Sequence, residues 1–144
     1  MRSYNAATTI NAPANMIWDI LVDVEKYPEW DPGIDHIEGR LAPGESIKFF
    51  TVIDPNQAFA VKVTTFEPAS KMVLTGGMPM GLFKSERTHT LTPNDDGTVE
   101  FQTEEIFGGL LLPLFGSKIP DLTKNFERFA SGLKRRAESQ ASES

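Results

Sequence analysis

Cysteine is absent from this chain, and histidine occurs only as His36 and His89. The lack of thiols excludes disulfide bonds, a thiolate nucleophile and cysteine-ligated metal sites. The two histidines lie far apart in the sequence and no His-Glu-x-x-His pattern is present, so we predict no metal site. No feature of the sequence indicates a cofactor.

Basic charge and long hydrophobic runs are also scarce. The 14 Lys and Arg residues are outnumbered by 20 Asp and Glu residues, which gives a net charge of −6. Since nucleic-acid binding requires a basic surface, we expect no nucleic-acid partner. The longest apolar stretch, residues 106–115, is too short to cross a bilayer, so no stable membrane insertion is expected. No N-terminal targeting segment is visible, and these absences together predict a soluble, cytoplasmic protein.

The chain is long enough to form one well-packed domain. At 144 residues, roughly 70% of the unfolded surface can be buried. The hydrophobic content of 40% is typical of globular proteins. We expect a single domain over residues 1–138, followed by a frayed Ser/Ala/Glu-rich tail over residues 139–144.

A long amphipathic helix is predicted near the C-terminus, between residues 117 and 137. Ser117 would cap it, and Pro120 would lie in its first turn. Gly132 costs about 1 kcal/mol relative to Ala within a helix, which indicates either close packing or space for a ligand. The buried stripe follows from apolar residues at intervals of three and four, namely Ile119, Leu122, Phe126, Phe129, Ala130, Leu133 and Ala137.

The rest of the chain is predicted to be mostly strands. A first strand over residues 3–10 leads to a short helix that begins near Pro13 and ends at Tyr27-Pro28. Six further strands are expected at residues 34–41, 46–53, 58–67, 71–77, 82–93 and 98–107. Their short connections favour an antiparallel meander. Alternation turns one set of side chains inward, namely Ile47, Phe49, Thr51, Ile53, Phe59, Val61, Val63, Met72 and Leu74.

The register of the last hairpin can be predicted from its turn. Asp95-Asp96-Gly97 suits a three-residue loop in which Gly97 takes the left-handed conformation. Counting back from this loop pairs Leu91 with Phe101, His89 with Thr103, Arg87 with Glu105 and Ser85 with Phe107. The polar side chains Arg87, His89, Thr103 and Glu105 should therefore face the apolar interior, together with Phe83, Leu91, Val99, Phe101 and Phe107.

These elements predict an α+β fold in which a curved antiparallel sheet of about seven strands wraps around the long C-terminal helix. Several local motifs accompany this order: Ile10-Asn11-Ala12-Pro13 followed by Trp18, Leu21 and Asp23; Tyr27-Pro28-Glu29-Trp30-Asp31-Pro32; and Gly44 before a strand. In these residues and in its order of elements, the whole chain resembles the START-like helix-grip superfamily, in particular the SRPBCC branch of polyketide cyclase/dehydrase and lipid transport-like proteins. The resemblance implies an apolar cavity between sheet and helix that holds lipids, sterols, polyketides or quinones. It supplies no shared catalytic motif, because fold alone does not give function.

The residues expected to face this cavity form the candidate ligand-binding set: Phe49, Val61, Val63, Leu74, Met80, Phe83, Arg87, His89, Thr103, Glu105, Phe126 and Phe129. Two interpretations of the polar members remain open. They could orient the polar group of a hydrophobic ligand. Alternatively, Arg87 and Glu105 could form a partly solvated cross-strand ion pair with a structural role only.

Three function classes follow. We expect binding of a small hydrophobic or amphipathic molecule. The alternative is a polyketide cyclase/dehydrase-type enzyme with His89 and Glu105 as acid and base, although no nucleophile–His–Asp constellation can be recognised. A third class is an adaptor that docks a protein partner or forms a homodimer, through the acidic region of residues 19–38 or the basic C-terminal helix. Residues 76–83 could form a ligand portal or a plain loop, and residues 108–115 could close the cavity, pack in the core, or contact a membrane or partner.

Overall fold

A computed structural model of the chain describes residues 2–52, 54–110, 112–115 and 121–143. The chain begins with strand β1 (Arg2–Ile10), helix α1 (Ala14–Val22) and the short 3-10 helix η1 (Val24–Glu29). A run of strands follows: β2 (Ile34–Glu38), β3 (Ser46–Thr51), β4 (Phe59–Glu67), β5 (Lys71–Met78), β6 (Phe83–Pro93) and β7 (Val99–Gly108). The 3-10 turn η2 (Pro79–Gly81) joins β5 to β6, while the short helix α2 (Leu112–Phe115) and the long helix α3 (Thr123–Glu143) follow β7.

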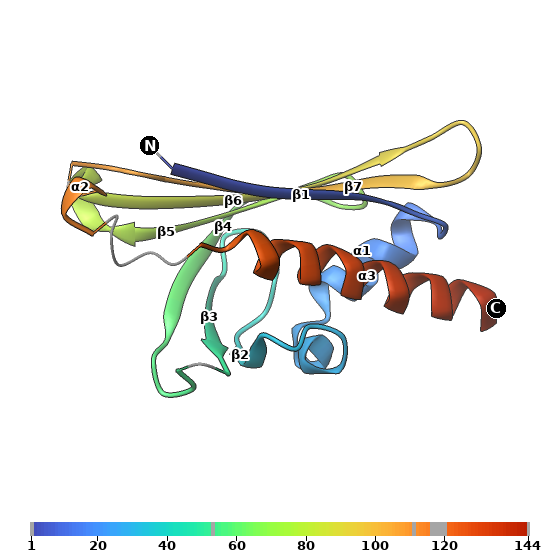
Figure 1. The fold of residues 1–144 in the computed structure, drawn as a ribbon, viewed down its shortest axis with the longest axis horizontal. Coiled ribbons are helices and arrows are strands. Elements are labelled where there is room, and N and C mark those ends of the chain that lie inside the picture. The colour runs from blue at the N-terminus through green and yellow to red at the C-terminus, as the bar shows by residue number, and fades with distance from the viewer. Residues whose placement is uncertain (1, 53, 111, 116–120, 144) are drawn as a thin grey trace.

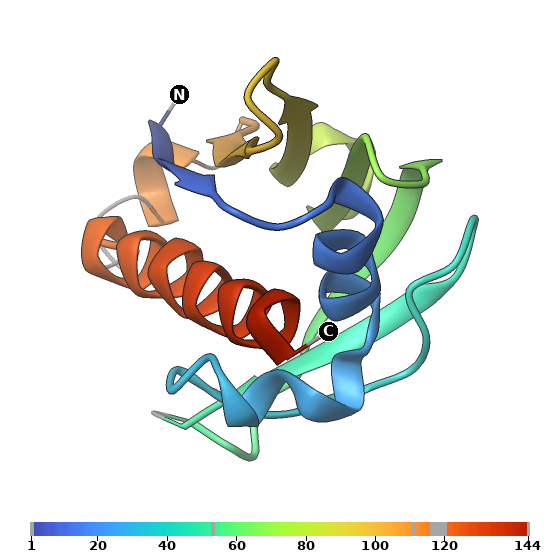
Figure 2. The same cartoon turned by 90° about the vertical axis from the view of Figure 1, so that its right-hand side faces the viewer.

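The seven strands form one antiparallel sheet in the order β1-β7-β6-β5-β4-β3-β2. Figure 1 shows that β4, β3 and β2 turn away from the plane of the other strands, so that the sheet has a concave side. Helix α3 lies along this side, and Figure 2, turned by 90° from Figure 1, shows the strands and α1 curling around it. The predicted α+β fold, a curved sheet around a long C-terminal helix, is confirmed.

The strands occur where the alternation predicted them, with small differences at their ends. The clearest difference is β2, which ends at Glu38 because Gly39 adopts a φ of +108°. Leu41, predicted to end this strand, is nevertheless buried in the core. Ile53 lies outside the described residues.

The ends of the C-terminal helix differ from the prediction. Ser117 and Pro120 lie outside the described residues, and the helix begins only at Thr123. Asp121 accepts hydrogen bonds from both the backbone N–H and the hydroxyl of Thr123, at 3.0 and 2.7 Å, which holds the chain in a local turn before the first helical residue. At the other end, residues 139–143 continue the helix where a frayed tail was expected.

The core lies between α3, α1 and the concave face of the sheet. The predicted helical stripe is buried from Phe126 to Ala137. From Phe129 onwards, the stripe packs in one cluster with Ile10 of β1, Ile17 of α1 and Phe101 of β7. Full burial of one such large apolar side chain contributes about 1.5–3 kcal/mol, so this cluster accounts for much of the stability.

Gly132 marks the place where α3 comes closest to the loop after η1. A Cβ built on this glycine would overlap the backbone carbonyl oxygen of Trp30. The helix and the loop are therefore in backbone contact, and the geometry supports close packing as the reason for a glycine here.

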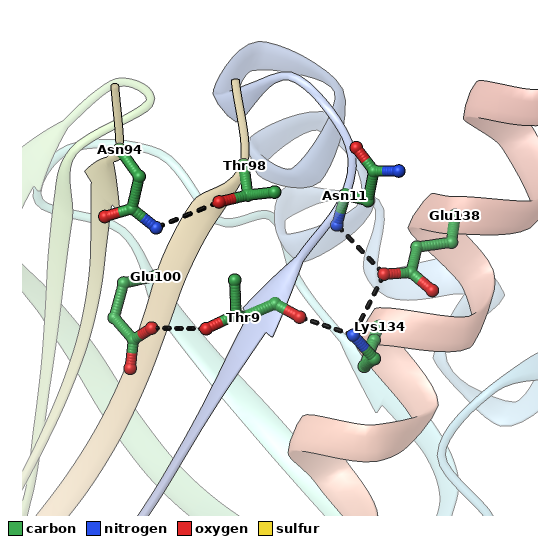
Figure 3. A network of polar contacts seen from close by, with 7 residues as sticks. All are labelled: Thr9, Asn11, Asn94, Thr98, Glu100, Lys134 and Glu138. Atoms are coloured by element: carbon green, nitrogen blue, oxygen red, sulfur yellow. Dashed lines mark hydrogen bonds and ion pairs between the residues drawn. The ribbon is translucent and has the colours of Figure 1, made fainter. Parts of the chain in front are cut away.

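A polar network holds the second half of α3 against the end of β1 (Figure 3). The Lys134 ammonium donates to the backbone carbonyl of Thr9 and pairs with Glu138 at 3.0 Å. The Glu138 carboxylate also accepts the backbone N–H of Asn11 at 2.9 Å. We call Lys134 and Glu138 the helix clamp, because these two residues join α3 to the strand at its C-terminal end.

Candidate functional site

The hairpin formed by β6 and β7 brings four polar side chains to the concave face. Its register pairs Arg87 with Glu105 and His89 with Thr103, as predicted from the turn. The turn itself has Gly97 at a φ of +88°, and its register is closed by a 2.8 Å hydrogen bond from the Asn94 N–H to the Thr98 carbonyl.

Arg87 and Glu105 form a two-point ion pair. The Arg87 Nε and Nη2 atoms each donate to a different oxygen of Glu105, both at 3.2 Å. The face of the guanidinium is covered as well, since its carbon lies 4.8 Å from the centre of the Phe126 ring. Both side chains are sheltered, with 28% of Arg87 and 13% of Glu105 exposed, so this pair is screened less by solvent than a surface ion pair.

His89 lies deeper than this pair and is surrounded by aromatic rings. It is only 3% exposed and stacks near Phe129 and Phe101, with ring centres 5.3 and 5.9 Å away. Its Nδ1 atom is buried without a hydrogen-bond partner among the described residues. Burial, reinforced by the charge of Arg87, lowers the pKa of His89 to about 3, so the ring is neutral at physiological pH. Thr103, opposite His89, is also buried.

Asp31 joins this polar centre from the loop after η1, although it was absent from the predicted set. It is 8% exposed, and its Oδ1 atom accepts the backbone N–H of Gly33 at 3.1 Å. Burial raises the pKa of Asp31, while the hydrogen bond from Gly33 and the charge of Arg87 act in the opposite direction. In the sequence, Trp30-Asp31-Pro32-Gly33 indicates only a turn. The one available signal was the spacing of Tyr27 and Trp30, which suggests that the turn packs its aromatic side chains inward.

Tyr27 completes the group of buried titratable side chains. Its hydroxyl donates to the backbone carbonyl of Leu21 at 2.5 Å. Burial raises the pKa of Tyr27, the nearby Asp31 adds to the increase, and Arg87 opposes it. The charge of Arg87 contributes to the pKa shifts of Tyr27, Asp31 and His89, and Arg87 is paired with Glu105. We call these five side chains the polar centre.

The candidate ligand-binding residues divide by their burial. Around His89, towards α1, the inward side chains are covered, whereas towards η2 and α2 several of them are only half-buried, although Phe107 is buried there too. The buried members are Val63, Leu74, His89, Thr103, Phe126 and Phe129; the half-buried members are Phe49, Val61, Phe83, Arg87 and Glu105. The Arg87–Glu105 pair therefore lies at the boundary between the closed core and the accessible end of the concave face.

Two inward predictions differ from the observed positions at this end. Phe59 lies on the same face of β4 as Val61 and Val63, but it is 53% exposed because α3 packs mainly against β1 and α1. Met80 is 91% exposed in η2, with a φ of +62°, so the structure does not bring it to the polar centre. Its contribution to ligand binding stays a prediction.

The two loops at this end lie side by side. The N–H of Leu110 donates to the carbonyl of Gly81 at 3.1 Å, which joins the β7–α2 turn to η2. One interpretation of the sequence was that residues 108–115 pack in the core. Leu110 does not, because it is exposed. Leu111 of this segment lies outside the described residues.

Two surface hollows lie outside the concave face, between the η1 region and α3. One of about 230 Å³ is lined by α1, the η1 region and α3, and one of about 500 Å³ by the end of η1, the loop after it and α3. Trp30 and Arg136 contribute to both. Arg136 pairs with Glu29 at 2.7 Å, so the walls of these hollows are already connected by a polar contact.

No group of three or more His, Asp or Glu side chains is placed to hold a metal ion within the part of the chain that the structure describes. Among the described helices, none has the length and apolar character needed to span a lipid bilayer.

Comparisons with known proteins agree with this architecture. A family described as polyketide cyclase / dehydrase and lipid transport matches residues 1–138. A comparison with curated proteins finds no match. Among solved structures, a START superfamily protein from Mycobacterium smegmatis has 19% identity and a TM-score of 0.70, with 96% of this chain and 98% of that chain covered. The Zhui aromatase/cyclase from Streptomyces sp. R1128 has 12% identity and a TM-score of 0.74, with 96% and 94% covered. A protein from Thermus thermophilus has 15% identity and a TM-score of 0.73, with 97% and 99% covered. At these identities the likeness shows a shared fold.

Proposed function

The chain belongs to the polyketide cyclase/dehydrase and lipid transport family, and on this basis we propose that it binds a hydrophobic or amphipathic small molecule between the concave face of its sheet and α3. The observation that carries the proposal is the gradient of burial along the concave face. An apolar surface that is closed at one end and accessible at the other, with a few polar groups between, has the composition of a small-molecule site.

The proposed ligand would lie with its apolar body against the half-buried side chains Phe49, Val61 and Phe83. Its polar group would reach the Arg87–Glu105 pair, where the closed part of the core begins. The buried members of the candidate set, such as Val63 and Phe129, would form the floor of the site. A lipid, a polyketide or a quinone each fits this description.

Catalysis of the polyketide cyclase/dehydrase type is the second candidate, and one observation favours it. Asp31 is a buried carboxyl group with a raised pKa, close enough to Arg87 to respond to its charge, as an acid or base would require. His89 suits this role less well, because its lowered pKa leaves it without a proton to give near neutral pH. Glu105 is held in its ion pair with Arg87. A protein partner, a homodimer and a cytoplasmic location stay predictions from the sequence.

The first test is native mass spectrometry of freshly purified protein, followed by extraction and identification of any bound molecule and by uptake from a panel of lipids, quinones and aromatic polyketides. We expect one ligand per chain. Val61→Trp should then reduce uptake, because it fills the accessible part of the concave face. Its control is Lys62→Trp, which places the same indole on the opposite, exposed face of β4. Absence of any uptake, or equal uptake by the two variants, would contradict the proposal. Turnover of a bound polyketide would support the second candidate.

A further inference from the structure

The polar centre has a charge arrangement that selects among ligands, and this inference rests on the proposed function. We propose that the site prefers an uncharged ligand, such as one carrying a hydroxyl, carbonyl or amide group, and that the Arg87–Glu105 pair excludes carboxylates of the fatty-acid kind.

The first step of the argument concerns the hydrogen bonds of Arg87. A guanidinium group offers five N–H donors in a fixed plane, and two of its edge positions already donate to Glu105. The ring of Phe126 covers its face. An incoming carboxylate has two options: it can displace Glu105 from the edge formed by Nε and Nη2, or it can contact the other edge, formed by Nη1 and Nη2, beside Glu105. In the second case one guanidinium has to serve two carboxylates, which leaves this sheltered site with a net negative charge.

The second step concerns what would happen to a displaced Glu105. Its side chain is 13% exposed, so it cannot simply turn into bulk water. On the inward face of the β6–β7 hairpin, Arg87 is the only lysine or arginine among the described residues. Arg2, opposite Phe107 at the outer end of β1, already has an interaction partner of its own. A sheltered carboxylate without a cation is costly, so the displacement is unfavourable.

The third step is the sum of charges. Arg87 and Glu105 cancel, His89 is neutral, and Asp31 adds a negative charge whenever it is ionised. Among the described residues, the interior thus has no surplus positive charge for an anionic ligand. An uncharged polar group meets no such penalty, because it can accept from the free Arg87 donors and donate to a carboxylate oxygen.

The experiment compares amides with carboxylates of the same shape. Dodecanamide is measured against dodecanoate, and cinnamamide against cinnamate, by calorimetry at about pH 7.5, where the acids are ionised. For each pair that binds, we expect the dissociation constant of the amide to be lower than that of the carboxylate by roughly tenfold or more. This is the effect expected when the carboxylate lacks one charge-assisted contact. Equal or tighter binding of the carboxylates would overturn the inference while leaving the proposed function in place.

Variants then test the cause of the selectivity. Glu105→Gln should free Arg87 and improve carboxylate binding by roughly tenfold or more, so that the preference disappears or reverses. The control is Glu104→Gln, which makes the same charge change on the exposed face of β7 and should keep the wild-type preference. Arg87→Gln should gain no carboxylate affinity.

Circular dichroism verifies that each variant folds. If the Glu105→Gln protein is folded but binds carboxylates no more tightly than wild type, the inference fails. If it does not fold, the inference is tested by the amide preference of the wild-type protein and by the carboxylate affinity of Arg87→Gln. Failure of both amides and both acids to bind wild-type protein would count against the proposed function itself and would overturn the inference with it.

Discussion

Substitution of Gly132 by alanine is the sharpest test of how α3 is packed. In an exposed helix this change stabilises, because alanine has the better helix propensity by about 1 kcal/mol. In this protein the added Cβ would overlap the carbonyl oxygen of Trp30, and its next nearest neighbours are the Trp30 carbonyl carbon and indole ring.

The expected size of the effect follows from these two terms. Overpacking of a filled core costs about 1–3 kcal/mol. The atoms that would have to yield belong to the backbone rather than to the end of a flexible side chain, so we expect the upper part of that range. After subtraction of the propensity gain, Gly132→Ala should lower the free energy of unfolding by about 2 kcal/mol.

Urea denaturation followed by circular dichroism measures this quantity directly. Ser139→Ala is the matched control, because Ser139 is exposed on the same helix and the change affects mainly helix propensity. It should raise the free energy of unfolding by a few tenths of a kcal/mol. A Gly132→Ala protein that is more stable than wild type, by the amount expected for propensity alone, would refute the reasoning that close packing requires glycine.

Three further predictions concern buried polar groups. His89 has a pKa of about 3 in the folded state against 6.5 in the unfolded chain, so the unfolded chain binds more protons between these two pH values. The free energy of unfolding should therefore be highest above about pH 6.5 and fall by roughly 1 kcal/mol per pH unit as the pH drops towards 3. In urea denaturation at a series of pH values, His89→Phe should remove this part of the pH dependence. Tyr27→Phe leaves the carbonyl of Leu21 without its donor and should cost about 1 kcal/mol in the same assay, whereas an unchanged midpoint would show that the hydrogen bond contributes nothing. The pKa of Asp31 is raised in the folded state, so its ionisation opposes folding at neutral pH. Asp31→Asn, whose side chain can still accept the backbone N–H, should raise the free energy of unfolding at pH 7 but not at about pH 3. A lower free energy of unfolding at pH 7 would contradict burial as the dominant cause of the raised pKa.

The sequence was sufficient to predict the sheet and its most informative register. Alternation with a period of two determines which face a strand residue occupies, and the Asp95-Asp96-Gly97 turn fixed which residue of β6 lies opposite which residue of β7. The Arg87–Glu105 pair could therefore be predicted from local rules alone. Alternation does not say how far a helix extends over that face, which is why the exposure of Phe59 was not predicted.

Asp31 shows a different limit of sequence reasoning. It lies in a turn, where a carboxylate is ordinarily solvated, and the neighbouring Tyr27 and Trp30 indicate only that the aromatic side chains of the turn pack inward, not that the carboxylate does. Its environment results from long-range packing: the loop of Trp30 packs against Gly132, and Arg87, which is distant in the sequence, contributes its charge from β6. The start of α3 was missed for a local reason, since the periodic pattern continues through Leu122 while the side chain of Asp121 favours a turn.

The position of the helix clamp has a mechanical consequence. Lys134 and Glu138 join α3 to β1 at one end of the helix, whereas Phe126, which covers Arg87, lies about two turns away. Helix α3 is therefore held to β1 near its C-terminal end, and a rotation about this end would move its N-terminal half the most. A small rotation about Lys134 would displace Phe126 much more than it displaces the clamp, and would uncover the guanidinium first. Widening of the interior for a bulky guest would then need few contacts to break at the pivot, and its cost would fall mainly on the aromatic contacts at the moving end.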